Sequence, residues 1–362
     1  MSLKIRITDQ RGTKLGEAFN ATGKTLTTTR NGTPTLKFSL PLWDPLVSEL
    51  SDGRVLAKAY YDKSLRFVGD PVSCDEDVTD TTQTATFTFV GPFNRLKQRL
   101  IGKSTIGELY EATARNEIVA DILDQANTTA DTGIRAGSME TLSAVDAGYY
   151  RYKPASEIIL ELAADYDGFD FKLSPKEPTL DSTGIQIASF YLASTIGSWR
   201  QNVKFDFASG NNYISSYKRT VKIEIANKLY SLPPGFPDTT TQLVLDTENT
   251  DSQTLYGMRE ALVDSDLVSD DLRDLLLQEA SAIYGTPRQT VEVELAPNIA
   301  YEPFRDFDVG DIVQLNFWQL TPDNDNSLRL SVLARIYQIE LTEDAEGGTQ
   351  IKLTLTEDGG AS

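Results

Sequence analysis

The first hundred residues alternate between apolar and polar side chains. Leu3, Ile5 and Ile7 share one face of such a segment. A period of two is typical of a half-buried β-strand, because successive side chains point to opposite faces. The pattern recurs, between Gly, Asp and Asn turns, over residues 35–40, 55–61, 65–68 and 84–90. So many short strands in about 100 residues indicate a small antiparallel barrel or sandwich.

The period changes to that of a helix after residue 100. One predicted helix has an apolar stripe at Ile118, Val119, Ile122, Leu123 and Ala126. A second has its stripe at Ile158, Ile159, Leu162, Ala163 and Tyr166. Pro154 suits the first turn of this second helix and Gly168 its end. Strand-like residues 169–173 and 185–192 follow, which indicates a small α/β unit.

Strand periodicity returns at Val203. Alternating segments cover residues 203–207, 213–217 and 221–225. Residues 232–237 contain three prolines and cannot continue a ladder, because proline has no N–H to donate. A helical segment follows, marked by Leu272, Leu275, Leu276 and Ile283, with Gly285 and Pro287 at its end. Strands resume at Thr290.

The fold class expected from this pattern is mainly β with α/β insertions. We predict a β-barrel-like domain over residues 1–100 and a small α/β domain over residues 101–205. A second β-barrel-like domain is split into residues 206–232 and 290–362. The segment that splits it, residues 233–289, is predicted to be a helix-containing insertion.

A weak internal repeat relates the two β-rich ends of the chain. The first copy contains Asp52-Gly53-Arg54-Val55 opening a strand, residues 65–68 beginning another, Asp75-Glu76-Asp77 as an acidic turn, and residues 84–89 as the closing strand. The second contains Val309-Gly310-Asp311-Ile312-Val313, residues 328–330, Thr342-Glu343-Asp344 as the turn, and residues 349–355. The order indicates two β units of one design in a single chain, although any two antiparallel meanders look alike at this level.

Composition and length are those of a globular protein, with 40% hydrophobic and 24% charged residues among 362. This length allows two or three domains of ~100–200 residues. No segment reaches the ~18 consecutive apolar residues that span a bilayer, and residues 1–7 lack the apolar run of a signal peptide. We therefore expect no membrane-spanning segment and folding in a cytoplasm.

The residue counts exclude several kinds of site. Cys74 is the only cysteine and there is no His, which removes disulfides, Cys-Cys metal pairs, imidazole zinc ligands and His-activated nucleophiles. The side chains that remain available for catalysis are carboxylates, Lys and Tyr. A glycosidase needs two carboxylates flanking the sugar, and no recognisable motif holds such a pair. We predict no catalytic, cofactor-binding or metal-binding residues, no cofactor and no enzyme.

Charge is the other strong constraint. The chain has 34 Lys and Arg against 53 Asp and Glu, a net charge of −19. Such a chain does not hold DNA by neutralising phosphates, which requires clustered basic residues. Acidic residues can line a passage through which DNA slides without sticking. The plainer interpretation is that the acidity keeps the protein soluble.

Two polar runs and two aromatic clusters are candidate binding features. Asp306, Asp308 and Asp311 lie close together, but we expect Gly310 to supply a turn conformation and the aspartates to be exposed turn residues. The run Asp323-Asn324-Asp325-Asn326 lacks the glycine and distal Glu of an EF-hand, which favours a solvated hairpin loop. Tyr149-Tyr150-Arg151-Tyr152 and Phe317-Trp318 suit sugar stacking, although core or interface packing is commoner.

Several motifs, in order along nearly the whole chain, resemble the baseplate-hub, or tail-associated, proteins of tailed phages. They are Phe38-Ser39-Leu40-Pro41 followed by Leu50-Ser51-Asp52-Gly53, Ala226-Asn227-Lys228-Leu229-Tyr230, residues 253–260, and residues 301–313. The last, Tyr301-Glu302-Pro303-Phe304-Arg305-Asp306-Phe307-Asp308-Val309-Gly310-Asp311-Ile312-Val313, is the most informative.

The resemblance implies a homotrimer at the tail tip. Two barrel-like domains per chain would give pseudo-six-fold symmetry that matches the tail tube or distal tail protein ring. The trimer would surround a channel for DNA or the tape-measure protein, with spike, fibre or receptor-binding proteins below. Some relatives carry a C-terminal hydrolase or receptor-binding extension, whereas this chain stops at Gly359-Gly360-Ala361-Ser362, so we expect such modules on another chain.

Two other functions remain open. One is a carbohydrate- or receptor-binding tail-tip protein, which would bind host cell-wall polysaccharide. The other is a carboxylate-based wall hydrolase, which would clear purified peptidoglycan. The structural hub is the preferred hypothesis, located at the virion tail tip and assembled in the host cytoplasm.

Overall fold

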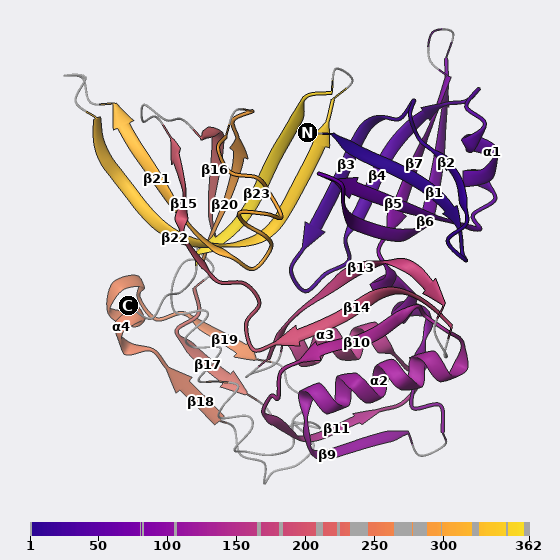
Figure 1. Cartoon of the computed structure of the whole chain (residues 1–362). Coiled ribbons are helices and arrows are strands. Elements are labelled where there is room, and N and C mark those ends of the chain that lie inside the picture. Colours follow the sequence, from indigo (N-terminus) through magenta and orange to yellow (C-terminus); the bar gives the residue numbers. More distant parts are fainter. Residues whose placement is uncertain are drawn as a thin grey trace. The chain divides into compact units, whose positions relative to one another are not determined.

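The computed structural model divides the chain into two compact units, residues 1–217 with 292–362, and residues 218–291. The structure describes residues 2–79, 81, 83–104, 107–164, 168–180, 184–207, 213–222, 225–231, 245–263, 277, 288–297, 299–320, 326–344 and 347–357 (Figure 1). No helix in this part of the chain has the length and apolar character needed to cross a membrane.

The chain begins with a β-rich part that we call the N-terminal barrel. Its elements are β1 (Leu3–Asp9), β2 (Lys14–Glu17), β3 (Thr22–Thr29), β4 (Thr35–Pro41), α1 (Leu46–Ser51), β5 (Val55–Tyr61), β6 (Ser64–Val78) and β7 (Gln83–Val90). The predicted inward face is buried, with Ile5 3% and Ile7 0% exposed. Phe38 stacks on Phe89 with ring centroids 5.7 Å apart. All five predicted strands of this part are confirmed.

The acidic turn predicted at residues 75–77 is wrong. These residues belong to β6 and pair with residues 84–86 of β7. Both faces of β6 are exposed over residues 72–78, so a strand accommodates three successive carboxylates there without burying any of them.

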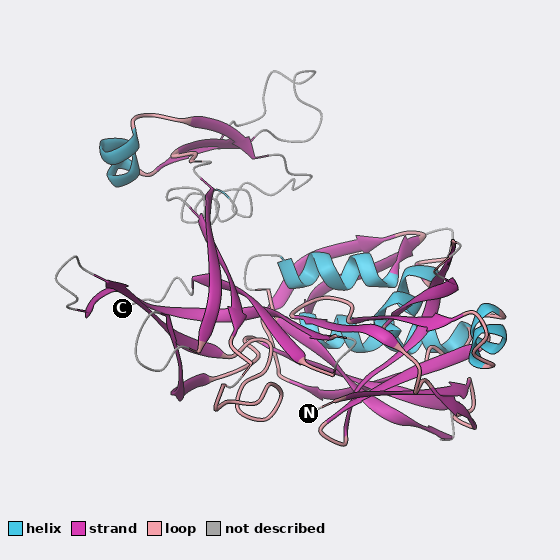
Figure 2. Ribbon diagram, turned by 90° about the horizontal axis from the view of Figure 1, so that it is seen from above, coloured by secondary structure: helices cyan, strands magenta, loops and turns pink. Residues whose placement is uncertain are grey.

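The next part, the α/β region, packs two helices against short strands. Its elements are a 3₁₀ helix (Pro92–Gln98), β8 (Leu100–Ile101), β9 (Glu108–Ala114), α2 (Arg115–Thr129), β10 (Ile134–Met139), β11 (Ala144–Tyr150), β12 (Lys153–Pro154), α3 (Ala155–Ala164), β13 (Asp170–Leu180) and β14 (Ile185–Ala193). Figure 2 shows α2 and α3 grouped beside the strands. They share one core with Phe171 and Phe190, whose rings stack with centroids 5.2 Å apart.

Both predicted helices are confirmed, with one correction at the start of the second. The stripe from Ile118 to Ala126 is fully buried in α2. Pro154 pairs with Leu100 and immediately precedes α3 instead of lying in its first turn. The described part of α3 reaches Ala164, and residues 165–167, which include Tyr166 and precede the predicted end at Gly168, lie outside the described residues.

The C-terminal barrel is built from six strands: β15 (Trp199–Phe207), β16 (Ile214–Lys222), β20 (Arg288–Leu295), β21 (Ile312–Leu320), β22 (Asn326–Glu343) and β23 (Thr349–Glu357). The predicted strands at 203–207, 213–217 and from Thr290 are found. Of the alternating segment 221–225, Val221 continues β16, residues 223–224 lie outside the described part, and Ile225 lies outside any strand.

The two barrels repeat the same strand order. One follows β3-β4-β7-β6-β5-β1 and the other β16-β20-β23-β22-β21-β15. In each, a long strand (β6 or β22) pairs with the preceding strand through its first half and with the following strand through its second. The repeat predicted from sequence is therefore confirmed. One difference is that β1 runs antiparallel to β5, whereas β15 runs parallel to β21.

The smaller unit contains a three-stranded sheet in the order β18-β17-β19, formed by β17 (Lys228–Ser231), β18 (Leu245–Glu248) and β19 (Glu260–Val263). Helix α4 (Thr250–Tyr256) is capped by Asn249, whose side chain accepts from Ser252 N at 2.9 Å. The Pro-rich segment 232–237 and the helix marked by Leu272, Leu275, Leu276 and Ile283 lie outside the described residues. Leu277, which is described, is helical and buried.

Candidate functional site

The feature that organises the larger unit is a join between its two barrels. Strand β3 pairs antiparallel with the second half of β22, from Thr29 opposite Gln338 to Lys24 opposite Glu343. This pairing merges both barrels into one continuous sheet (Figure 1). Thr28 also donates its hydroxyl to Ile339 O at 3.4 Å. The barrels are therefore fixed edge to edge by backbone hydrogen bonds.

A buried carboxylate completes this join. Glu343 Oε2 accepts from Leu3 N at 2.6 Å, and Oε1 lies 2.7 Å from Lys24 Nζ. The side chains of Lys24 and Glu343 are 14% and 9% exposed, so the pair is largely shielded from water. The turn predicted at 342–344 is wrong for its first two residues, which end β22, and only Asp344 lies in the turn.

A second joining point surrounds Gly310 and Asp311. Gly310 has φ = 89°, the turn conformation predicted for it. Asp311 is 1% exposed, and Asp306 and Asp308 are partly buried, which corrects the prediction that all three are exposed turn residues. Its carboxylate accepts from Ser198 N at 2.8 Å, Arg200 Nε at 2.8 Å and Asp308 N at 2.9 Å. A carboxylate with three donors can be buried because each donor replaces a lost water.

Two glycines allow this corner to be so compact. The chain segments at Gly197 (φ = 97°) and Gly310 pass back to back, and a Cβ on either would collide with the backbone of the other segment. Arg335 Nη1 donates to Ile196 O and Gly310 O, each at 3.3 Å. The segment that leaves the α/β region is thereby fixed to β22.

The N-terminal barrel is fixed to the α/β region at Asn31, which has φ = 52°. Its side-chain amide donates to Phe169 O at 3.2 Å, and its Oδ1 accepts from Phe171 N at 2.7 Å. Asp170 also accepts from Ile196 N at 3.0 Å and lies 3.5 Å from Arg30. The hydrophobic pattern did not indicate these residues, although Asn31 followed by Gly32 is a recognisable signal for a left-handed turn.

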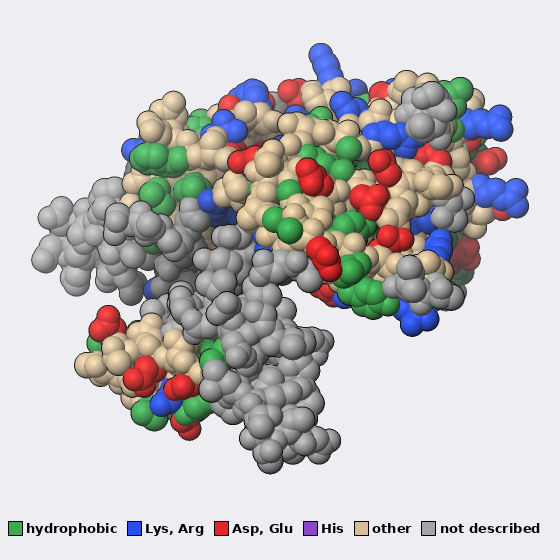
Figure 3. All heavy atoms as spheres, turned by 90° about the horizontal axis from the view of Figure 1, so that it is seen from below, with side chains coloured by type: hydrophobic (Ala, Val, Ile, Leu, Met, Phe, Trp, Pro, Cys, Tyr) green, Lys and Arg blue, Asp and Glu red, His purple; other side chains and the backbone are tan. Residues whose placement is uncertain are grey.

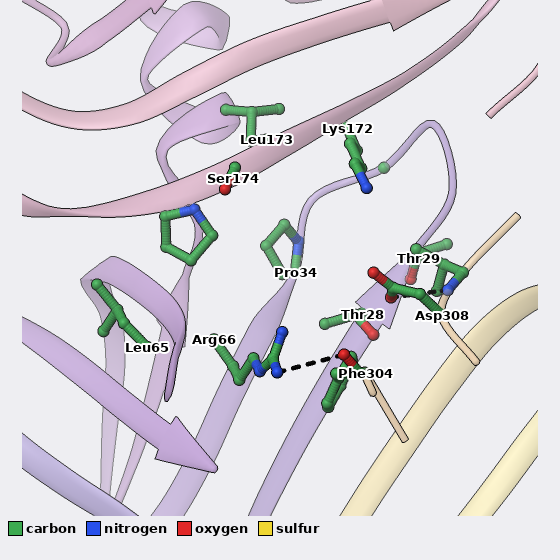
Figure 4. A pocket seen from close by; sticks show the side chains of 13 residues that line it. Thr28, Thr29, Pro34, Leu65, Arg66, Lys172, Leu173, Ser174, Phe304 and Asp308 are labelled. Carbon is green, nitrogen blue, oxygen red and sulfur yellow. Dashed lines mark hydrogen bonds between the residues drawn. The ribbon is translucent and has the colours of Figure 1, made fainter. Parts of the chain in front are cut away.

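A cavity of about 120 Å³ lies where the three parts meet (Figure 4). Arg66 donates to Phe304 O at 3.3 Å, and its guanidinium stands 5.0 Å from the Phe304 ring centroid. Asp308 lies on the opposite wall, and burial raises the pKa of its carboxyl group despite the opposing effects of Lys172 and the Val309 amide. Burial lowers the pKa of Arg66. Charged and polar side chains therefore line the cavity at the contact between the three parts.

The three aspartates of the 306–311 segment do not converge on a ligand. Asp306 accepts from Glu302 N at 2.7 Å and pairs with Arg305 at 2.8 Å, whereas Asp308 bonds Val309 N at 2.8 Å. Within the described residues no group of three Asp, Glu or Cys side chains is arranged to hold a metal ion. Residues 323–325 lie outside the described part, and Asn326 begins β22.

The predicted aromatic clusters divide between core and surface. Tyr150 is buried and its ring centroid lies 6.0 Å from that of Tyr110. Tyr149 and Tyr152 are 56% and 54% exposed. Phe317 is buried against Tyr217 with centroids 4.6 Å apart, whereas the Trp318 side chain is outside the described part.

Acidic side chains are prominent on the face that Figure 3 shows. They stand over the middle of the larger unit, while Lys and Arg lie largely along its margin. On the α/β region, helix α2 presents exposed Glu117, Asp121 and Asp124. The negative net charge is thus carried in part by a solvated surface.

No family model and no curated protein sequence matches this chain. Solved structures do match over nearly its whole length. The 43 kDa tail protein of prophage MuSo2 from Shewanella oneidensis is 10% identical, with a TM-score of 0.64 and 98% of each chain covered. The tail protein from Neisseria meningitidis is 10% identical, with a TM-score of 0.62, covering 99% of this chain and 98% of that one.

A third similar structure comes from a secretion system. The E. coli c3393 protein is described as a component of the type VI secretion system with structural similarity to the T4 bacteriophage tail proteins gp27 and gp5. It is 9% identical, with a TM-score of 0.51, covering 99% of this chain and 77% of that one. The chain has the fold of phage tail proteins, as the sequence resemblance predicted.

Proposed function

We propose, from the premise that the chain has the fold of phage tail proteins, that it is a non-enzymatic structural component of a phage tail tip. In this proposal three copies form a ring that connects the tail tube or distal tail protein to the tip and surrounds the DNA channel. The observation that carries it is the repeated strand order of the two barrels, joined through β3 and β22. Two similar units per chain would let a trimer match a six-fold tube.

In this proposal the two predicted β-barrel-like domains of each chain, residues 1–100 and the split segment 206–232 with 290–362, form the ring. The proposed partners are a second and third copy, the distal tail or tube protein, the tape-measure protein, and spike, fibre or receptor-binding proteins at the virion tail tip. An acidic ring would let DNA pass without specific binding.

The test is the oligomeric state of the full chain. Light scattering after size exclusion should give the mass of three chains, and negative-stain electron microscopy should show end-on rings with three-fold symmetry and six lobes. A chain that stays monomeric over a wide range of concentration, and also when mixed with the tube protein, would contradict the proposal.

A second candidate function, carbohydrate binding at the tail tip, is favoured by one observation. Tyr149 and Tyr152 expose more than half of their surface close to one another in sequence. Sedimentation of the protein with purified host cell-wall polysaccharide tests it. Binding that Tyr149→Ala and Tyr152→Ala weaken would support this role, and no sedimentation would exclude it.

A further inference from the structure

Within the chain, the join between the barrels gives one segment of β22 a paired strand on both of its edges. Residues 338–343 in the second half of β22 pair with β23 along one edge and with β3 along the other. All six of these residues are buried or partly buried. The join leaves neither edge of this strand segment open.

The repeat contains the same two elements a second time, without the pairing. The counterpart of that segment is residues 72–78 of β6, which pair only with β7 among the described strands. The counterpart of β3 is β16, which pairs only with β20 among the described strands. Residues 72–78 and 215–221 are exposed at every position. Exposed strands with an open edge are templates for pairing with another chain.

The two open strands carry opposite charges. Residues 72–78 contain Asp75, Glu76 and Asp77 and no basic residue, whereas residues 215–221 contain Lys218 and Arg219 and no acidic residue. Inside the chain, the covered join also places a lysine on the β3 side against a carboxylate on the β22 side, Lys24 against Glu343. The same polarity, Lys218 against Asp75, Glu76 or Asp77, is therefore available between copies.

We infer that β16 of one copy pairs antiparallel with residues 72–78 of β6 in the next copy. This inference rests on the proposed trimer and identifies the surfaces that form it. Each chain then has one join inside and one join to its neighbour, so three chains close a ring of six barrels. The contact is heterologous, and closure after three copies leaves no strand edge of this kind open.

Cys74, the only cysteine, lies within the β6 segment and is exposed, which allows a direct test. Cysteines are introduced singly at Lys218, Arg219, Thr220 and Val221 of the full chain. Paired strands bring opposite Cα atoms to about 4.5–5.5 Å, within disulfide range. Oxidation should link copies into dimers and trimers in at least one variant, and Cys74→Ser should abolish the links. Leu15→Cys, on exposed β2, is the matched control and should give none.

The outcomes separate this inference from the proposed function. Trimers by light scattering without any link from β16 to Cys74 would overturn the strand pairing and leave the trimer intact. Monomers at every concentration would overturn both. As an independent readout, Asp77→Lys and Lys218→Glu should each raise the concentration needed for trimers severalfold, and the double variant should regain most of the loss. If the effects of the two substitutions on trimer formation simply added up in the double variant, this result would also overturn the pairing.

Discussion

Gly53 and Gly310 occupy corresponding positions in the two barrels but lie in different surroundings. Both have positive φ, 73° and 89°, and both precede the strand that opens the repeat, β5 or β21. A Cβ at Gly53 would meet nothing within 4 Å, whereas one at Gly310 would strike Ile196 O. The two glycines occupy equivalent positions in the sequence pattern, but only Gly310 has no room for a Cβ atom.

We expect Gly310→Ala to destabilise the protein far more than Gly53→Ala. Alanine at either site pays about 1–2 kcal/mol for the left-handed conformation. At Gly310 the crossing segments must also move apart, which should bring the cost above about 3 kcal/mol. Urea unfolding of both variants measures the difference, and equal losses would contradict the crowding seen at the corner.

The partly buried carboxyl group of Asp308 predicts a pH effect. Because its pKa in the folded state is raised above 3.8, the stability linked to it is fully present below that pH and is lost as the pH rises through the folded-state pKa. Asp308→Asn avoids this loss. The variant should therefore melt at a higher temperature than the parent at pH 7, and the gain should shrink toward pH 4.

Asp306 is the matched control with the opposite sign. Its pKa is lowered, chiefly by the hydrogen bond from Arg305, so its contribution is present above pH 3.8 and is lost as the pH falls. Asp306→Asn should lower the melting temperature at pH 7. Thermal unfolding followed by circular dichroism between pH 4 and pH 7 distinguishes the two variants. Melting temperatures that change with pH in the same way for Asp306→Asn and Asp308→Asn would contradict the opposite pKa shifts.

At the scale of elements, the pairing of β3 with β22 turns two barrels into one sheet. Lys24 and Glu343 stand at one end of that pairing, shielded from water. Lys14 and Glu17 form an ion pair of similar length, 2.7 Å, on the edge strand β2, where the lysine side chain is 55% exposed. The two pairs differ mainly in burial.

Lys24→Ala should cost about 2–3 kcal/mol of unfolding free energy, because it leaves the buried Glu343 carboxylate without its cation. Lys14→Ala should cost under about 1 kcal/mol, as exposed ion pairs do. Chemical denaturation at low and high salt is the measurement. A Lys24→Ala variant as stable as Lys14→Ala would mean that the backbone pairing alone holds the join.

At the scale of the whole molecule, the smaller unit interrupts a single hairpin. Its residues 223–287 connect β16 to β20, the counterparts of β3 and β4, which only residues 30–34 connect in the first barrel. Replacing residues 223–287 with the sequence of residues 30–34 should leave the larger unit folded. Closing a short loop costs little entropy, and the native strands keep their partners.

This deletion is checked by circular dichroism and cooperative melting. A midpoint within about 5 °C of the parent is expected, since a change of about 1 kcal/mol shifts a domain of this size by a few degrees. Loss of the cooperative transition would show that the smaller unit is needed for the fold of the larger one.

Properties that arise locally could be predicted from the order of the amino acids. Alternation predicted β1, β4, β5 and β7, and helical spacing predicted α2, because both periods reflect which side chains face a core. The repeat was visible because each copy carries its glycine and its strands in the same order. The absence of His narrowed the available chemistry without any knowledge of the fold.

Which charges are buried and which strand edges pair became known only from the folded structure. Asp311 and Glu343 look like ordinary turn residues in sequence, yet one donor to each lies 113 and 340 positions away, respectively. Nothing local marks a carboxylate for burial, because its cost depends on donors brought by other segments. Lateral strand pairing likewise has no local signature, since every strand offers the same backbone groups. For this reason the join between the barrels, on which the proposed assembly rests, emerged only from the folded chain.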